Sequence, residues 1–468
     1  MNLCCNIKYS FVAAKRKLCY ISPSNLGNYK KSRASLCSYI NIKKTLIIIL
    51  IFLISQAVIL AADETSKLSL LPAIKEAIAN NPELKMISKK LESSKIKASK
   101  MGVLDEPRFG IGFLNLPVSS FSFGEMDETM KEFKFMQMFP FPGKLSLREQ
   151  VGIFESDIVN EEYRQKKNEI MYKVKTSYYE LYLVLKSVEI VKKNKDLLGE
   201  IIKIANAKYL SSDGLQGDVL RAQVEFAQMM NELIMLEQKR KTAEAQINTL
   251  LFRNTEISIS GVEEVTKIKS ELTFGTIKQT AIENSPLLKL SDFNLKRNEI
   301  AHSLAKKEYF PDFDLGVAYS QRDSAIDGTK RNDMFSIMLA VNLPFLWGPK
   351  SYEVDSTKIE IDEAQANYDS IKNEIFYMIK DILSEIEKAD RMLNLFETGI
   401  LPQAKQVLEI TKANYQSGKV DFLALLDAQR TLYKYEVENY NIIVEYEKNL
   451  ATLEFIAGKN IGGKDDKF

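Results

Sequence analysis

The chain has very little histidine and cysteine, two residues on which much enzyme and metal chemistry depends. Among its 468 residues there is one histidine, His302, and the four cysteines all lie in the first 40 residues: Cys4, Cys5, Cys19 and Cys37. The rest of the chain therefore has no thiolate metal site and no disulfide framework. A catalytic centre or zinc site built on histidine is nearly excluded. Since we find neither a nucleotide-binding loop nor a nucleophile constellation, we expect no enzyme, no cofactor and no resident metal.

Acidic residues outnumber basic residues once the start of the chain is set aside. Residues 1–62 carry nine Lys or Arg and no Asp or Glu, which leaves 55 basic against 62 acidic residues from Asp63 onward. Nucleic-acid binding depends on an excess of basic side chains that neutralise phosphates. An acidic body therefore argues against a nucleic-acid partner.

Residues 1–62 have the pattern of a signal or targeting region. Two lysines precede an apolar run, which ends in small residues before Asp63, as is typical of an export signal. Cleavage after Ala57 or after Ala62 fits this pattern. The alternative is a single membrane anchor, because the run approaches spanning length. No second apolar run of that length follows, so a mature protein within a membrane would have to be a β-barrel.

The remaining chain is an internal duplication, the first possibility to test in a long sequence. Ala77–Leu84 reads AIANNPEL and Ala281–Leu288 reads AIENSPLL. Further landmarks pair in the same order: Pro107 with Pro311, Pro140 with Pro344, Tyr172 with Tyr377, Tyr209 with Tyr415, and Gln223 with Gln429. We predict a first repeat over 63–270, a second over 271–460 and a polar tail over 461–468.

Each repeat is expected to begin with a helix, at about 68–100 and about 273–308. Asn-Asn-Pro and Asn-Ser-Pro interrupt these helices near their starts. Two strands follow, because apolar residues then alternate with period two. The alternating residues are Phe109, Ile111, Phe113, Phe133 and Phe135, then Phe313, Leu315, Val317, Tyr319, Phe335, Ile337, Leu339, Val341 and Leu343.

Two long helices are expected to close each repeat. They cover about 145–211 and 216–253, then about 351–416 and 419–457, and Pro402 should kink the third. At about 1.5 Å per residue the first is about 100 Å long, too long for a compact domain. Its heptad-like apolar spacing indicates packing along a neighbouring helix.

The predicted strands are too few to close a barrel, because small outer-membrane barrels need about eight. They must then be shared between copies, with the alternating apolar face toward lipid. Aromatic residues at the strand ends suit a belt at the membrane interface: Phe139, Phe141, Phe345 and Trp347. The alternative is a small buried sheet in a soluble protein.

Two segments resemble the TolC-like family of outer-membrane efflux proteins. Ile400–Tyr433 reads ILPQAKQVLEITKANYQSGKVDFLALLDAQRTLY and is similar to the second-repeat motif, while Gln137–Arg148 reads QMFPFPGKLSLR and resembles the strand-to-helix passage. The resemblance covers about 68–460. It implies a mainly α fold with a membrane β-barrel: a homotrimer in the outer membrane, with a twelve-stranded barrel continued by a periplasmic helical tube. It also implies a periplasmic adaptor protein and an inner-membrane pump as partners.

The resemblance further implies a gate near the turns between the long helices. Asp427 falls on one family aspartate position, and Asp218 falls on a position that helps latch the closed state. Family members carry a second aspartate where this chain has Ala424, and a basic latch partner where it has Val420. The wiring of a closed gate must therefore differ here.

Simpler roles are open for the residues near these turns. Asp421 is a third gate candidate, but Asp218 or Asp421 could simply begin the return helix as an N-cap. Gly418 suits the backbone geometry of the turn. If three symmetry-related aspartates surrounded a narrow axis, they would attract cations and raise one another's pKa values.

Methionines cluster around the first predicted hairpin, at Met126, Met130, Met136 and Met138. Thioethers are soft ligands that could contact copper or silver in transit. More often methionines fill apolar surface, so we assign no metal site.

Three functions fit these expectations. The first is a passive exit duct of a tripartite efflux system for drugs or metal cations, driven by an inner-membrane pump. The second is the outlet of a type I protein secretion system, which would use the same duct. The third is a periplasmic coiled-coil scaffold without a pore.

Overall fold

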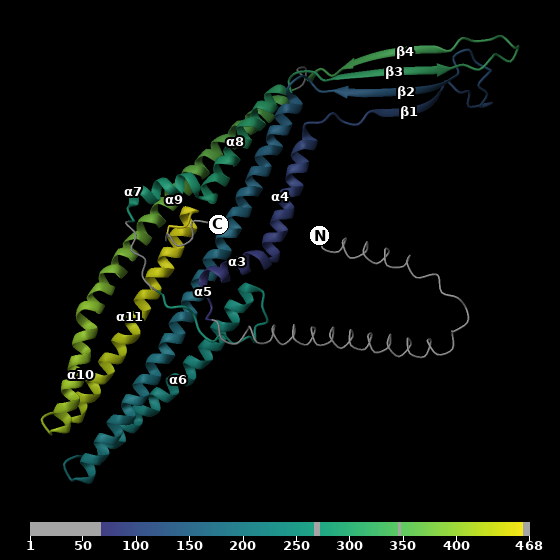
Figure 1. Ribbon diagram of the computed structural model, residues 1–468. Helices are drawn as coiled ribbons and strands as arrows, with labels where there is room; N and C mark the ends of the chain where they lie inside the picture. The colour runs from purple at the N-terminus through teal and green to yellow at the C-terminus, as the bar shows by residue number, and fades with distance from the viewer. Residues whose placement is uncertain (1–66, 266–271, 345–347, 462–468) are drawn as a thin grey trace, which may run out of the picture. The chain divides into compact units, whose positions relative to one another are not determined.

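The computed structural model describes residues 67–265, 272–344 and 348–461 (Figure 1). The predicted signal region 1–62 lies outside these residues, as do Phe345, Trp347 and almost all of the polar tail. Lys67–Phe468 forms one compact unit by its contacts, and its described part is the subject below.

The same order of elements occurs twice along the chain (Figure 1). The first series is α3 (Leu70–Asn80), α4 (Pro82–Met101), β1 (Arg108–Leu114), β2 (Met130–Phe139), α5 (Lys144–Leu210) and α6 (Gln216–Leu251). The second is α7 (Phe274–Asn284), α8 (Pro286–Lys307), β3 (Phe313–Gln321), β4 (Met334–Val341), α9 (Pro349–Leu395), the π-helical turn η3 (Phe396–Ile400), α10 (Leu401–Gln416) and α11 (Phe422–Ala457). The predicted duplication is confirmed.

The break between the first two helices of each series follows from local sequence. The Asn81 side chain accepts a hydrogen bond of 2.9 Å from the Leu84 amide, and Pro82 occupies the first turn of α4. Pro286 has the same place in α8 after Ser285. Proline is favoured there because its missing N–H has no helical partner in any case.

Pro402 alters the long helix of the second repeat. Proline cannot donate the helical hydrogen bond to the residue four before it, and its ring crowds that carbonyl. The chain responds with the π-helical turn η3, in which the Leu401 amide donates to the Phe396 carbonyl. α5 has no proline and runs as one helix of 67 residues, about 100 Å long.

The described strands form a four-stranded antiparallel sheet in the order β1-β2-β3-β4. Odd-numbered residues share one face: Phe109 pairs with Phe135, and Phe133 lies between Ile111 and Tyr319. This face is apolar and exposed, with Phe109, Phe335 and Ile337 among its most exposed members. Leu343, expected in the last strand, lies just after it, since β4 ends at Val341.

The helices pack through apolar clusters, of which the first and the third below contain residues of both repeats. α5 contacts α4, α6, α8 and α11. One cluster centres on Val174, Leu181 and Ile247, a second on Ile379 and Leu453. A third lies toward the hairpin ends of α5, α6, α10 and α11. In the described ranges, no helix combines the length and the apolar character needed to cross a membrane.

His302 has a structural contact between α8 and α9. Its Nδ1 lies 2.9 Å from Oγ1 of Thr357, whose hydroxyl donates to the Glu353 carbonyl at 3.0 Å. At the equivalent crossing of α4 and α5, Ala98 lies against Gly152. A Cβ added to Gly152 would lie 2.7 Å from the Ala98 Cα, so only glycine allows this close approach.

Candidate functional site

The ends of the two long helix pairs lie against each other (Figure 1). Lys208, at the end of α5, donates a hydrogen bond of 3.4 Å to the Gln416 carbonyl at the end of α10. Its amine also lies 5.4 Å from the centre of the Tyr415 ring. The turns that were expected to form a channel mouth therefore meet within one chain.

Both turns use the same backbone geometry, as the duplication requires. The Asp213 amide donates to the Lys208 carbonyl at 2.9 Å, and the Lys419 amide donates to the Asn414 carbonyl at 2.8 Å. Each turn contains one residue with positive φ: Ser212 at 63° and Gly418 at 74°. Glycine adopts this left-handed conformation without strain, whereas serine does so at a cost.

Asp421 caps α11. Its side chain accepts a hydrogen bond of 2.9 Å from the Ala424 amide, and its backbone is extended, as is usual for an N-cap. One carboxylate oxygen is thereby used in holding the helix start. Leu215 precedes α6 at the equivalent place and offers no side-chain cap.

Asp218 lies in the first turn of α6 and faces the Tyr415 hydroxyl of α10. Burial raises the pKa of Tyr415 to about 12, and the nearby Asp218 carboxylate contributes to this shift. Tyr415 is 3% exposed, whereas Tyr209, its counterpart in the first repeat, is 42% exposed. The family resemblance indicated a basic partner for Asp218 at position 420, where this chain has Val420, and did not predict the role of Tyr415.

Asp427 lies on the exposed side of α11, one turn before Arg430. Arg430 forms an ion pair with Glu225, a buried carboxylate on α6. The hydrogen bond that Arg430 donates to Glu225 raises the pKa of Arg430, and the charge of Asp427 adds to this effect. The guanidinium therefore links α6 to α11 and lies close to a predicted gate residue.

Further polar contacts join the two helix pairs above the turns. Lys412 on α10 forms an ion pair of 2.9 Å with Glu200 on α5. The buried Gln429 amide donates to Asn194 at 3.2 Å. Within the described part of the chain, no group of three His, Cys, Asp or Glu side chains could hold a metal ion. Asp218, Asp421 and Asp427 thus do not meet as one cluster in a single chain.

A second polar centre lies where the strands join the helices. Lys144, at the start of α5, is fully buried, and its amine contacts Asp312 at 2.8 Å, Glu308 at 3.2 Å and the Phe310 carbonyl at 2.9 Å. The Phe141 amide also donates to Asp312 at 2.8 Å. These contacts join the exit of β2 to the entry of β3.

The Asp312 carboxyl is strongly biased toward its charged form. Burial alone would raise its pKa, but the hydrogen bonds from Lys144 and from the Phe141 amide outweigh burial and hold the pKa below its ordinary value. No pattern in the sequence points to this centre, apart from a lysine after Pro-Phe-Pro-Gly. Of the expected aromatic belt, Phe139 is exposed at the end of β2, whereas Phe141 stacks on Phe310 with ring centres 4.6 Å apart.

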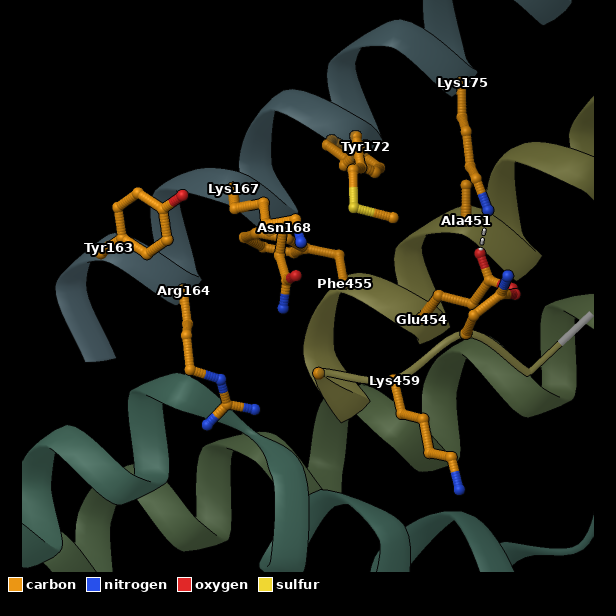
Figure 2. A pocket seen from close by; sticks show the side chains of 13 residues that line it. Tyr163, Arg164, Lys167, Asn168, Tyr172, Lys175, Ala451, Glu454, Phe455 and Lys459 are labelled. Carbon is orange, nitrogen blue, oxygen red and sulfur yellow. Dashed lines mark hydrogen bonds and ion pairs between the residues drawn. The ribbon is translucent and has the colours of Figure 1, made fainter. Parts of the chain in front are cut away.

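A pocket of about 330 Å³ lies between α5 and the end of α11 (Figure 2). At its rear, Lys175 and Glu454 form a buried ion pair of 2.6 Å. The rings of Tyr172 and Phe455 stack with centres 5.4 Å apart. Arg164 points away from this pair and donates to the Asn284 carbonyl at 3.1 Å. These contacts tie the two repeats together where the end of α11 meets α5.

Comparisons with known proteins agree with this architecture. The chain is similar to the cobalt-zinc-cadmium resistance protein CzcC of Cupriavidus metallidurans, with 20% identity over 293 residues that cover 63% of this chain and 68% of CzcC. It is similar to the pyoverdine export outer membrane protein OpmQ of Pseudomonas aeruginosa, with 20% identity over 261 residues. That match covers 56% of this chain and just over half, 55%, of OpmQ.

The fold is similar to that of the outer membrane protein VceC of Vibrio cholerae. The TM-score is 0.70 at 18% identity, and the match covers 84% of this chain and 96% of VceC. The family described as outer membrane efflux protein matches residues 73–251 and 277–459, which include both series of elements. The chain therefore belongs to the outer membrane efflux protein family and is a protein of the outer membrane.

Proposed function

We propose that this protein is the outer-membrane channel of a tripartite efflux system, a passive exit duct for drugs or metal cations. The proposal rests on the properties of the four-stranded sheet. Its odd-numbered face is apolar and exposed, and neither β1 nor β4 has a strand partner at its outer edge within the described residues. An exposed apolar face with open edges needs both lipid and further strands.

Three copies of the chain satisfy both needs. Each copy contributes β1–β4 to one twelve-stranded barrel in outer-membrane lipid, and the long helices continue the barrel into the periplasm as a tube. Phe139, exposed at the end of β2, lies at the lipid interface. A periplasmic adaptor protein connects the duct to an inner-membrane pump, which supplies the energy.

The turns at the ends of the helix pairs form the gate. Asp427, exposed on α11, is brought by threefold symmetry toward its copies, where like charges repel anions and attract cations. The Asp218–Tyr415 contact and the Arg430–Glu225 ion pair hold the two helix pairs of each chain together. Asp421 and Gly418 set the geometry of the turn.

Metal cations are favoured among the substrates by the similarity to CzcC, whose name records resistance to cobalt, zinc and cadmium. The similarity to a pyoverdine export protein keeps organic solutes open as a second class. The outlet of a type I secretion system would use the same duct with a different pump. A scaffold without a pore does not account for the exposed apolar sheet.

Single-channel recording in planar bilayers tests this function and its gate together. The purified protein is expected to give discrete conductance steps, and Asp427→Ala is expected to raise the conductance or the frequency of opening. Asp362→Ala is the matched control, because Asp362 is an exposed aspartate on α9, away from the turns. Equal records for Asp427→Ala and the native protein would remove Asp427 from the gate. The absence of any conductance would overturn the duct.

A further inference from the structure

The even-numbered face of the sheet carries an unusual set of side chains. The register places residues of even number in β2, β3 and β4 opposite one another, on the face away from the exposed aromatic residues. In the described strands this face holds five methionines: Met130, Met136, Met138, Met334 and Met338. Its other members are mostly small or polar, so the methionines supply most of its apolar surface.

Two of these methionines flank a glycine of the middle strand. Met136, Gly316 and Met338 form one row across β2, β3 and β4. A Cβ placed on Gly316 would lie 3.4 Å from the Met136 Cγ and 3.5 Å from the Met338 Cε. Their backbones are two strand spacings apart, about 10 Å. The missing side chain at Gly316 therefore lets the two thioether arms approach each other across the middle strand.

Contact with lipid does not explain these methionines. In the proposed channel the odd-numbered face meets lipid, so the even-numbered face lines the water-filled interior. A methionine side chain is unfavourable on a wall in contact with water, because its apolar surface stays exposed. The charged neighbours on this face, Glu132, Lys134 and Asp314 among them, are of both signs and do not form a simple ion pathway.

Thioether sulfur is an uncharged, polarisable ligand that binds soft cations. It prefers monovalent copper and silver over zinc, cobalt or magnesium, which favour nitrogen or oxygen. No cysteine follows Cys37, and the one histidine, His302, lies on α8 rather than in the sheet. No stronger soft ligand in the sheet therefore competes with the methionines.

We propose that Met136 and Met338, with Met138 in the next row of the same face, form a transit site for soft monovalent cations such as Cu⁺ or Ag⁺ on the inner wall of the channel. The site rests on the proposed function, since this face becomes an interior wall only in the assembled channel. Weak, repeated thioether contacts suit transit, because a cation must leave each site as readily as it enters.

Silver binding to the full-length protein in lipid nanodiscs tests the site. Methionines labelled with ¹³C at the ε-methyl group are titrated with silver nitrate in chloride-free buffer. The methyl signals of Met136 and Met338 are expected to shift first, and Met136→Leu/Met338→Leu is expected to weaken silver binding at least tenfold. The control Met86→Leu/Met235→Leu changes two exposed methionines on α4 and α6 and should leave binding unchanged. Equal binding by both double variants would overturn the site.

Potassium conductance of the same samples separates this inference from the proposed function. Silver ions are expected to reduce the potassium current of the native channel at concentrations that leave the current of Met136→Leu/Met338→Leu unchanged. A native protein that conducts potassium but shows no silver effect and no methyl shift would remove the transit site alone. A native protein without any potassium conductance would remove the proposed duct.

Discussion

Lys144 offers the sharpest test of what holds the sheet to the helices. The substitution Lys144→Met keeps the length and most of the volume of the side chain but removes its charge. The amine is fully buried and contacts two carboxylates and a carbonyl. Without it, Glu308 retains Arg148 at 3.2 Å, whereas Asp312 loses its ion-pair partner and retains the Phe141 amide.

The expected loss follows from the partner left behind. Removing one member of a buried ion pair typically costs about 3–5 kcal/mol, because the other charge stays buried without compensation. Since Asp312 keeps one amide hydrogen bond, we expect the lower end, about 3 kcal/mol. The double variant Lys144→Met/Asp312→Asn removes the stranded charge and keeps an acceptor for the Phe141 amide. It is expected to recover about 1–2 kcal/mol of the loss.

Denaturation in detergent, followed by the helical circular dichroism signal, measures these differences. The control is Lys90→Met, which removes an exposed ion pair of 2.6 Å with Glu162 and should change the free energy of unfolding by about 1 kcal/mol or less. If Lys144→Met were no more destabilising than Lys90→Met, or if the double variant were less stable than the single one, the reasoning about the junction would be wrong.

Three further predictions concern the same polar contacts. The pKa of Asp312 is held below its ordinary value, so its stabilising effect is present above the ordinary carboxyl pKa and is lost as the pH falls through the lowered value. Asp312→Asn should therefore reduce the loss of thermal stability on acidification. An acid profile equal to that of the native protein would contradict this. Tyr415→Phe keeps the buried ring but removes the hydroxyl on which the charge of Asp218 acts, so channel opening in bilayers should become more frequent; unchanged opening would place this pair of residues outside the gate. Arg430→Gln leaves Glu225 buried without its cation and should lower the free energy of unfolding by about 1–3 kcal/mol in urea titration. A free energy of unfolding equal to that of the native protein would show that the ion pair does not contribute to stability.

The sequence predicted those parts of the fold that depend on local chemistry. The helix breaks at Asn81 and Ser285 follow from a proline after a short polar residue. The two strands of each repeat follow from alternation, and the unbroken α5 follows from the lack of proline. Pro402 predicted a disturbance, but the proline alone does not specify its form, the π-helical turn at Phe396–Ile400.

The candidate site divides in the same way. The capping role of Asp421 is local and was one of the two interpretations open from sequence. The approach of Asp218 to Tyr415, and of Arg430 to Glu225, joins residues of different repeats that only tertiary packing brings together. The burial of Tyr415 and the exposure of its counterpart Tyr209 show how duplicated sequences acquire different environments, which a repeat alignment does not reveal.

In the proposed trimer β1 of one copy pairs with β4 of the next, and disulfide cross-linking can detect this pairing. Within one chain β1 and β4 are separated by β2 and β3, about 14 Å of sheet, whereas a disulfide needs Cα atoms within about 7 Å. Cysteines placed at Phe109, Ile111 or Phe113, each combined with one at Ile337, can therefore join only different copies. Trimers joined by disulfides are expected in membranes for at least one of these cysteine pairs. Monomers throughout, from a mature protein that stays in solution without detergent, would contradict it.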